Sequence, residues 1–158
     1  AARDILRSRP HGLVLSNGPG DPAALPQIVA AAAELLERLP VFGICLGHQV
    51  LARALGARTF KLPFGHHGSN HPVREEASGR VFITTQNHGF AVDPDGLAAG
   101  GAEATMLNLN DRTNEGLRHR RLPVLGVQFH PEAAPGPHDT RFLFDEFLKR
   151  AGEARPRA

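Results

Sequence analysis

The sequence predicts an α/β fold: an open, mostly parallel sheet flanked by helices, with a small antiparallel hairpin region. Two observations predict it. Twice, a short apolar strand ends in a glycine-rich turn and is followed by a helical segment. Nearer the C-terminus, two strands flank a polar turn. The 158 residues fit one domain, which we expect to span residues 1–150, with a disordered tail at 151–158.

The first unit begins with the strand Leu13–Leu15, which enters a turn at 16–22 rich in Gly and Pro. Asp21 is placed to cap a helix whose apolar spacing continues over residues 25–39. The strand Val41–Ile44 follows. Strand, helix and strand form a βαβ unit with parallel strands, so the turns that follow the two strands lie at the same edge of the sheet. Ligands bind at that edge in open α/β sheets.

Cys45 is the only cysteine, and it occupies the turn of the second unit between Gly43 and Gly47. The layout is strand, tight turn and helix, which is the nucleophile elbow with sulfur in place of hydroxyl. A helix follows over residues 50–55 and ends at Gly56, and we expect its N-terminus to favour the thiolate and to stabilise an oxyanion. The alternative is that Cys45 is only a small buried apolar residue.

A second candidate site follows the apolar strand at 124–129. The strand runs into His130, Pro131 and Glu132. Pro131 keeps its neighbour extended, so His130 and Glu132 can project to the same side. A carboxylate there can accept the Nδ1 proton of His130 and direct Nε2 outward. Cys45, His130 and Glu132 thus match the logic of a catalytic triad.

Three histidines, His66, His67 and His71, lie in a segment at 59–73. A metal site is one interpretation, but no carboxylate or cysteine keeps a ligand spacing beside them. We therefore predict no metal in this chain. The preferred interpretation is a loop that packs beside the active site.

The remaining segments complete the expected fold. Residues 81–85 alternate as a strand, and residues 104–109 and 116–120 form the antiparallel hairpin. Asp139 is placed to cap a last amphipathic helix. The apolar residues expected on its inward face are Phe142, Leu143, Phe144, Phe147 and Leu148.

Composition excludes several classes of function. The formal charge is +2 and the basic residues are scattered, so no nucleic-acid-binding patch is indicated. No apolar run approaches the ~18 residues that cross a membrane, and no signal peptide is recognisable. A single cysteine excludes an internal disulfide and is typical of a reducing, cytoplasmic location.

The motifs also carry a family resemblance. Residues 43–49 and 130–132 resemble the class I, or triad-type, glutamine amidotransferases. Four further segments resemble the carbamoyl-phosphate synthase small chains within that class; they are residues 15–22, 64–73, 86–92 and 135–139. The resemblance runs from about residue 5 to residue 148 and implies a flavodoxin-like fold of the class I glutamine amidotransferase type.

The resemblance implies a glutaminase that hydrolyses L-glutamine to glutamate and ammonia through a glutamyl thioester. Cys45 is then the nucleophile, His130 the acid and base, and Glu132 its orienting partner. Backbone N–H groups of Leu46 and Gly18 form the oxyanion hole. The residues expected to bind glutamine are Gly18, Gly20, Leu46, Gln49, Asn87, Gly89 and Phe90. For Gly89 and Phe90 a plain turn and a core position are the alternatives.

The resemblance also implies a partner. Ammonia would pass to a carbamoyl-phosphate synthase large chain in a hetero-oligomer serving arginine and pyrimidine biosynthesis. ATP and Mg²⁺ are expected on that large chain, because residues 16–22 lack the lysine and spacing of a phosphate-binding loop. No cofactor is expected in this chain. The chain starts at Ala1 without a methionine, as a fragment would. Compared with the family it resembles, it is expected to lack the domain's first strands and the small chain's N-terminal domain.

Three alternatives stay open at this point. An amidotransferase of anthranilate or guanylate synthesis shares the elbow and the His-Pro-Glu segment but differs around residues 87–90. A docking or regulatory fragment could retain the triad without turnover. A cysteine peptidase on a similar elbow is less compatible with the segments that resemble a glutamine site.

Overall fold

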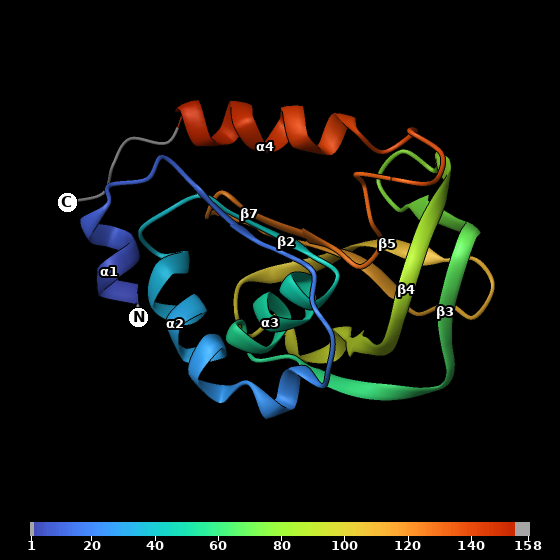
Figure 1. The fold of residues 1–158 in the computed structure, drawn as a ribbon, viewed down its shortest axis with the longest axis horizontal. Helices are drawn as coiled ribbons and strands as arrows, with labels where there is room; N and C mark the ends of the chain where they lie inside the picture. The colour runs from blue at the N-terminus through green and yellow to red at the C-terminus, as the bar shows by residue number, and fades with distance from the viewer. Residues whose placement is uncertain (1, 154–158) are drawn as a thin grey trace.

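The computed structural model describes residues 2–153, which form one mixed sheet with helices on both faces (Figure 1). Its strand order is β1-β2-β7-β6-β4-β3-β5, and β6 also pairs with β5. The strands are β1 (Leu13–Leu15), β2 (Val41–Ile44), β3 (Arg58–Glu75), β4 (Val81–Asp93), β5 (Ala102–Asn108), β6 (Asn114–His119) and β7 (Val124–Val127). The α/β class is as predicted, but the sheet is not mostly parallel.

The parallel part consists of β1, β2 and β7. Leu13 pairs with Val41, and Val41 pairs with Val124. The four residues of β2 and the four of β7 are all buried, which is typical of central strands covered on both faces. As the βαβ pattern predicted, β1 and β2 end at the same edge of the sheet.

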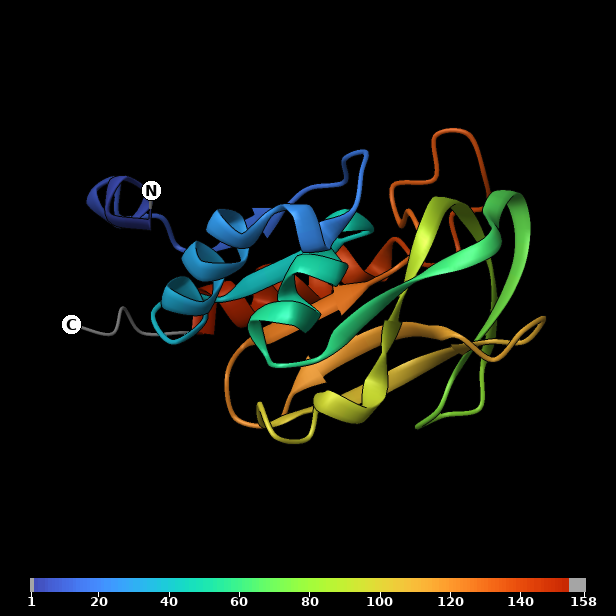
Figure 2. The same cartoon turned by 90° about the horizontal axis from the view of Figure 1, so that it is seen from below.

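The remaining strands are antiparallel and form a region much larger than the predicted hairpin. Pairings of β4 with β3, β3 with β5, β5 with β6 and β6 with β4 close this region into a small barrel-like unit (Figure 2). The segment of three histidines is therefore a strand, not a loop. Its backbone groups pair with β4 at His66 opposite His88 and at His67 opposite Asn87.

Helices cover the parallel part on both faces. Figure 1 shows α4 on one side of the sheet and α2 and α3 on the other. Asp21 does act as a cap, but its carboxylate accepts from Ala23 N at the start of a short 3₁₀ helix rather than of α2. The helices are α1 (Ala2–Arg7), η1 (Pro22–Ala24), α2 (Pro26–Leu36), α3 (Leu46–Ala54), η2 (Pro94–Gly96) and α4 (Phe142–Glu153).

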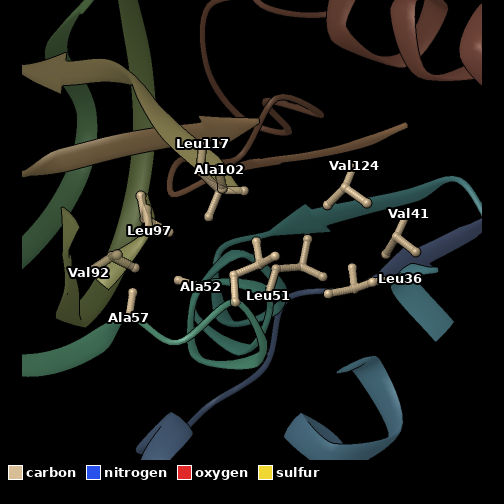
Figure 3. Packing of buried hydrophobic residues seen from close by; sticks show 11 residues of the cluster. Leu36, Val41, Leu51, Ala52, Ala57, Val92, Leu97, Ala102, Leu117 and Val124 are labelled. Atoms are coloured by element: carbon tan, nitrogen blue, oxygen red, sulfur yellow. The ribbon is translucent and has the colours of Figure 1, made fainter. Parts of the chain in front are cut away.

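Two clusters of buried apolar residues form the core, one on each face. On the α3 face, Leu51 and Ala52 belong to a cluster with Val124 of the parallel part and Leu117 of the antiparallel part (Figure 3). On the α4 face, Phe42 packs its ring against Phe144 and Phe147 at 5.8 and 5.6 Å between centroids. The cluster on the α3 face thus contains residues of the parallel part, of the antiparallel part and of α3, the helix that follows Cys45.

The last helix differs from the prediction in three respects. It begins at Phe142, so Asp139 does not cap it. Leu148, expected to face inward, is 65% exposed, whereas Phe147 and Ala151 are buried. The helix continues through Glu153, so residues 151–153 are not a disordered tail; residues 154–158 lie outside the described residues. In residues 2–153 no helix is both long and apolar enough to cross a membrane.

This arrangement predicts different effects for two neighbouring substitutions in α4. Phe147→Ala is expected to lower the free energy of unfolding by about 3–5 kcal/mol, because it removes a buried ring and leaves a cavity beside Phe42. Leu148→Ala is expected to change it by less than about 0.5 kcal/mol. Urea unfolding of both variants measures the difference; equal losses would contradict the orientation of α4.

Candidate active site

The elbow predicted around Cys45 is present between β2 and α3. Cys45 has φ 53° and ψ −107°, a strained conformation for a non-glycine residue. Close packing explains the glycines on both sides. A Cβ on Gly43 would lie 2.6 Å from Leu51 Cδ1, and a Cβ on Gly47 would lie 1.9 Å from Leu15 O. The backbone N–H of Cys45 donates to Val127 O at 2.9 Å, which ties the elbow to the strand leading to His130.

Cys45 opens onto a cavity of about 420 Å³ at the carboxyl ends of β1 and β2. Eight of the predicted site residues line it: Gly18, Gly20, Cys45, Gln49, Asn87, Gly89, Phe90 and His130. Leu46 and Glu132 were also predicted, but they are not among the lining residues. The fold therefore brings together residues from four separate segments. Their individual roles stay predictions.

His130 and Glu132 make the predicted contact. His130 Nδ1 donates to Glu132 Oε1 at 2.6 Å, and the His130 backbone N–H donates to Thr85 O at 2.8 Å. Within residues 2–153, the other ring nitrogen, Nε2, is buried and has no hydrogen-bond partner. Because His130 lines the cavity, this nitrogen is the atom available to exchange a proton there.

Burial raises the pKa of the Cys45 thiol to about 11. The backbone N–H of Leu46, at the start of α3, acts in the opposite direction, while the negative charges of Glu132 and Glu115 add to the increase. The predicted influence of the helix N-terminus is therefore present, because the Leu46 N–H lowers the pKa, but it is smaller than the effect of burial in the unliganded site. Desolvation outweighs the helix, so Cys45 is a thiol at neutral pH.

Gly18 and Leu46, predicted to form the oxyanion hole, are neighbours. A Cβ on Gly18 would lie 3.0 Å from Leu46 Cδ2. Leu46 is the first residue of α3, whose first-turn N–H groups have no partner within the helix. The proximity of the two residues is compatible with a pair of backbone donors facing one oxygen beside Cys45.

Gln128 belongs to the site, although the sequence analysis treated it as part of an apolar strand. It is fully buried, its Nε2 lies 3.9 Å from Cys45 Sγ, and its Oε1 accepts from Gln49 Nε2 at 3.0 Å. Gln49 Nε2 also donates to Phe90 O at 2.8 Å. A polar side chain inside an otherwise apolar run was the signal that could have identified it.

Two further residues at the cavity were also not predicted. His67 lines it and its Nδ1 lies 2.9 Å from Asn87 Oδ1, where it can hold the Asn87 amide in one orientation. Asn17 lines the cavity from the β1 turn, and its Oδ1 accepts from Ser16 Oγ at 3.0 Å. Both lie in segments already identified as resembling the family, but neither contact can be inferred from sequence spacing.

His88, which also lines the cavity, forms a group with His66 and Glu115 whose candidate ligand atoms lie within 4.8 Å of one another. This carboxylate comes from β6, so it could not be recognised from spacing near the histidines. His66 is already engaged: Nε2 contacts Asp111 Oδ2 at 2.8 Å and Nδ1 lies 3.6 Å from Glu115 Oε1. Glu115 and then Asp111 raise the pKa of His66 to about 9. In the structure these contacts form a network of charged and hydrogen-bonded groups around His66.

The buried histidines predict a maximum of stability near pH 6.5. The pKa of His66 is raised to about 9, so its contribution is complete below about 6.5 and is lost as the pH rises to 9. Burial lowers the pKa of His48 to about 3 and of His88 to about 4, so stability is lost as the pH falls below 6.5.

We expect an alkaline loss on the order of 1–2 kcal/mol, because solvent screens the partly exposed Asp111. Urea unfolding between pH 4 and pH 9 measures the profile. His66→Gln is expected to remove the decline above pH 6.5 and to leave the acid limb in place. An alkaline decline of the same size in that variant would refute the assignment.

Comparisons with known proteins agree with these features. Residues 1–150 match the family described as glutamine amidotransferase class-I. The chain is 57% identical over 148 residues to a carbamoyl phosphate synthase small chain of Akkermansia muciniphila, covering 94% of this chain and 40% of the relative. It is 58% identical over 143 residues to the small chain of Desulfovibrio desulfuricans, covering 90% and 38%. The chain thus spans about 40% of the length of these relatives.

Solved structures support the fold. A Thermoplasma acidophilum protein described as belonging to a GMP synthase is 22% identical, with a TM-score of 0.74 over 90% of this chain and 73% of that one. A glutamine amidotransferase of Thermotoga maritima is 19% identical, with a TM-score of 0.63 over 89% and 78%. The resemblance read from the sequence motifs is confirmed. The chain therefore belongs to the class I glutamine amidotransferase family.

Proposed function

We propose that the chain is the glutamine-hydrolysing part of a carbamoyl-phosphate synthase small chain. The observation that carries the proposal is the shared cavity, in which Cys45 and His130 lie among the residues predicted to bind glutamine. The 57% identity to a carbamoyl phosphate synthase small chain favours this branch over amidotransferases of anthranilate or guanylate synthesis.

In the proposed reaction, His130 Nε2 takes the proton of the Cys45 thiol, and the sulfur attacks the side-chain amide carbon of glutamine. The pKa of about 11 makes this proton transfer necessary. The tetrahedral oxyanion is stabilised by the N–H groups of Leu46 and Gly18. His130 then protonates the leaving nitrogen, which departs as ammonia and leaves a γ-glutamyl thioester.

In the second half, His130 takes a proton from water, and the resulting hydroxide attacks the thioester carbon. Collapse of this intermediate breaks the carbon–sulfur bond, and the proton on His130 returns to the Cys45 sulfur as glutamate leaves. Glu132 holds the Nδ1 proton and stabilises the imidazolium in both halves. Gly20, Gln49, Asn87, Gly89 and Phe90 are the proposed contacts for the α-amino and α-carboxylate groups of the substrate.

Ammonia would then reach a large synthetase chain, where ATP and Mg²⁺ support the synthesis of carbamoyl phosphate for arginine and pyrimidines. This part of the proposal rests on the relatives, which are small chains of carbamoyl phosphate synthase and are thereby expected to have a large-chain partner. The reduced thiol that the chemistry requires fits the reducing cytoplasm. The second candidate, a docking fragment without turnover, is favoured by the high thiol pKa in the unliganded site.

The test is ammonia release from L-glutamine by the full chain and by Cys45→Ser, each with and without a carbamoyl-phosphate synthase large chain. We expect release that rises with the large chain and falls on the order of 10³-fold or more in Cys45→Ser. Binding of the large chain without any ammonia release would support the docking fragment. Stimulation only by an anthranilate or guanylate synthase partner would assign the chain to those pathways.

A further inference from the structure

Gln128 holds a fixed orientation, although its amide oxygen and nitrogen have nearly the same shape. The chain of contacts starts at Phe90 O, which can only accept a hydrogen bond. Gln49 must therefore turn its Nε2 toward Phe90, at 2.8 Å. The second proton on the same nitrogen reaches Gln128 Oε1 at 3.0 Å. With its oxygen engaged, Gln128 directs its own Nε2 at Cys45 Sγ, 3.9 Å away.

Cys45 Sγ lies between two groups of opposite character. Asn87 O, also at 3.9 Å, can only accept, so it favours the thiol. Gln128 Nε2 can only donate, so it favours the thiolate. Gln49 and Gln128 are 2% and 0% exposed, so water cannot readily replace the donor once the sulfur is charged.

We propose that Gln128 is a thiolate-stabilising residue, held in its donor orientation by Gln49, which acts as a positioning residue. This inference rests on the proposed function, because it assigns these residues to the charged form of the nucleophile that the reaction uses. It also gives Gln49 a role besides substrate contact: both protons of its Nε2 are used within the protein.

Other groups also act on the Cys45 sulfur. The negative charges of Glu132 and Glu115 raise the pKa of Cys45, and the Leu46 N–H and the Gln128 amide lower it. His130 lines the same cavity. Gln128 is thus the neutral side chain that opposes burial and both carboxylates at this sulfur.

The test is the titration of Cys45 in the full chain, followed by the ultraviolet absorbance of the thiolate and referenced to Cys45→Ser. The sequence contains no tyrosine or tryptophan, so no phenolate titrates in the same range. In Gln128→Met, which keeps the size and loses the donor, the thiol pKa is expected to rise by about one unit. Alkylation of Cys45 by iodoacetamide below pH 9 should slow by about tenfold.

Gln49→Met is expected to shift the pKa in the same direction by a smaller amount, because Gln128 can then rotate. Adding Gln49→Met to Gln128→Met should cause no further shift, since Gln49 acts through Gln128. The matched control is Gln86→Met: Gln86 is equally buried, but its amide contacts Thr84 and His88 and not the sulfur. It should leave the Cys45 pKa unchanged even if it lowers stability.

If Gln128→Met does not fold, Gln128→Asn replaces it, because the shortened amide no longer reaches the sulfur. A folded Gln128 variant with an unchanged Cys45 pKa overturns the inference, as does a double variant with additive shifts. The titration needs no glutamine. If the Cys45 pKa rises as expected in the Gln128 variant but the parent chain releases no ammonia, the proposed function is wrong and the role of Gln128 stands. If the Cys45 pKa is unchanged in that variant, the role of Gln128 is wrong, whatever the ammonia assay gives.

Discussion

Gly47→Ala is expected to prevent stable folding, with a loss of more than about 4 kcal/mol in the free energy of unfolding. The new Cβ would lie 1.9 Å from Leu15 O and 2.6 Å from Leu15 C, both backbone atoms of β1. A flexible side chain could move aside, but a paired strand cannot do so without breaking its contacts with β2. The first turn of α3 would have to move away from the sheet and carry Cys45 with it.

Urea unfolding followed by circular dichroism measures this loss. Gly89→Ala is the control, because a Cβ there has no atom of residues 2–153 within 4 Å and the residue needs no positive φ. This variant should remain folded. Any effect of Gly89→Ala should appear in the KM for glutamine, since Gly89 lines the cavity. A Gly47→Ala protein as stable as the parent would show that the elbow is less tightly packed than described.

Glu132→Gln is expected to lower kcat for ammonia release by up to about 10⁴-fold, the loss seen when the carboxylate of a Ser-His-Asp triad becomes an amide. The carboxylate accepts the Nδ1 proton of His130 at 2.6 Å. An amide can offer an N–H at that position, which favours the tautomer with its proton on Nε2. It also removes the negative charge that stabilises the imidazolium. His130 would then be a poor acceptor for the Cys45 proton.

Steady-state ammonia release at saturating glutamine, with the partner chain present, measures this effect. Glu146→Gln is the matched control, because Glu146 forms an i,i+4 ion pair with Arg150 on the partly exposed side of α4. It should change kcat by less than about twofold. A loss smaller than about tenfold in Glu132→Gln would mean that His130 is oriented by its backbone bond to Thr85 alone.

Local patterns predicted the elements on which the proposed catalytic residues lie. The glycines at 43 and 47 indicate a tight turn because only glycine fits such close backbone contacts. His130 and Glu132 are two residues apart, so their contact follows from extended geometry around one proline. The common edge reached by β1 and β2 follows from the parallel βαβ unit.

The long strand β3 could not be predicted in the same way. Gly65, Gly68 and Pro72 are typical of loops, and the segment lacks a regular alternation of buried residues. It becomes a strand because β4 offers pairing partners along nearly its whole length, from Arg58 opposite Asp93 to Arg74 opposite Val81. Near the turn the paired residues are close in sequence, but at the far end Arg58 pairs with Asp93, so a short window does not contain the signal for the first half of the strand.

By itself, the sequence determined the family, the elbow, the histidine–glutamate pair and the edge where the site lies, because each depends on residues close together in the chain. Only the tertiary structure decided the mixed sheet, the orientation of Gln128 and the charge of Cys45. Burial by distant strands raises the thiol pKa more than the adjacent helix N-terminus lowers it. Desolvation depends on every segment packed around an atom, and the sequence near that atom does not contain them.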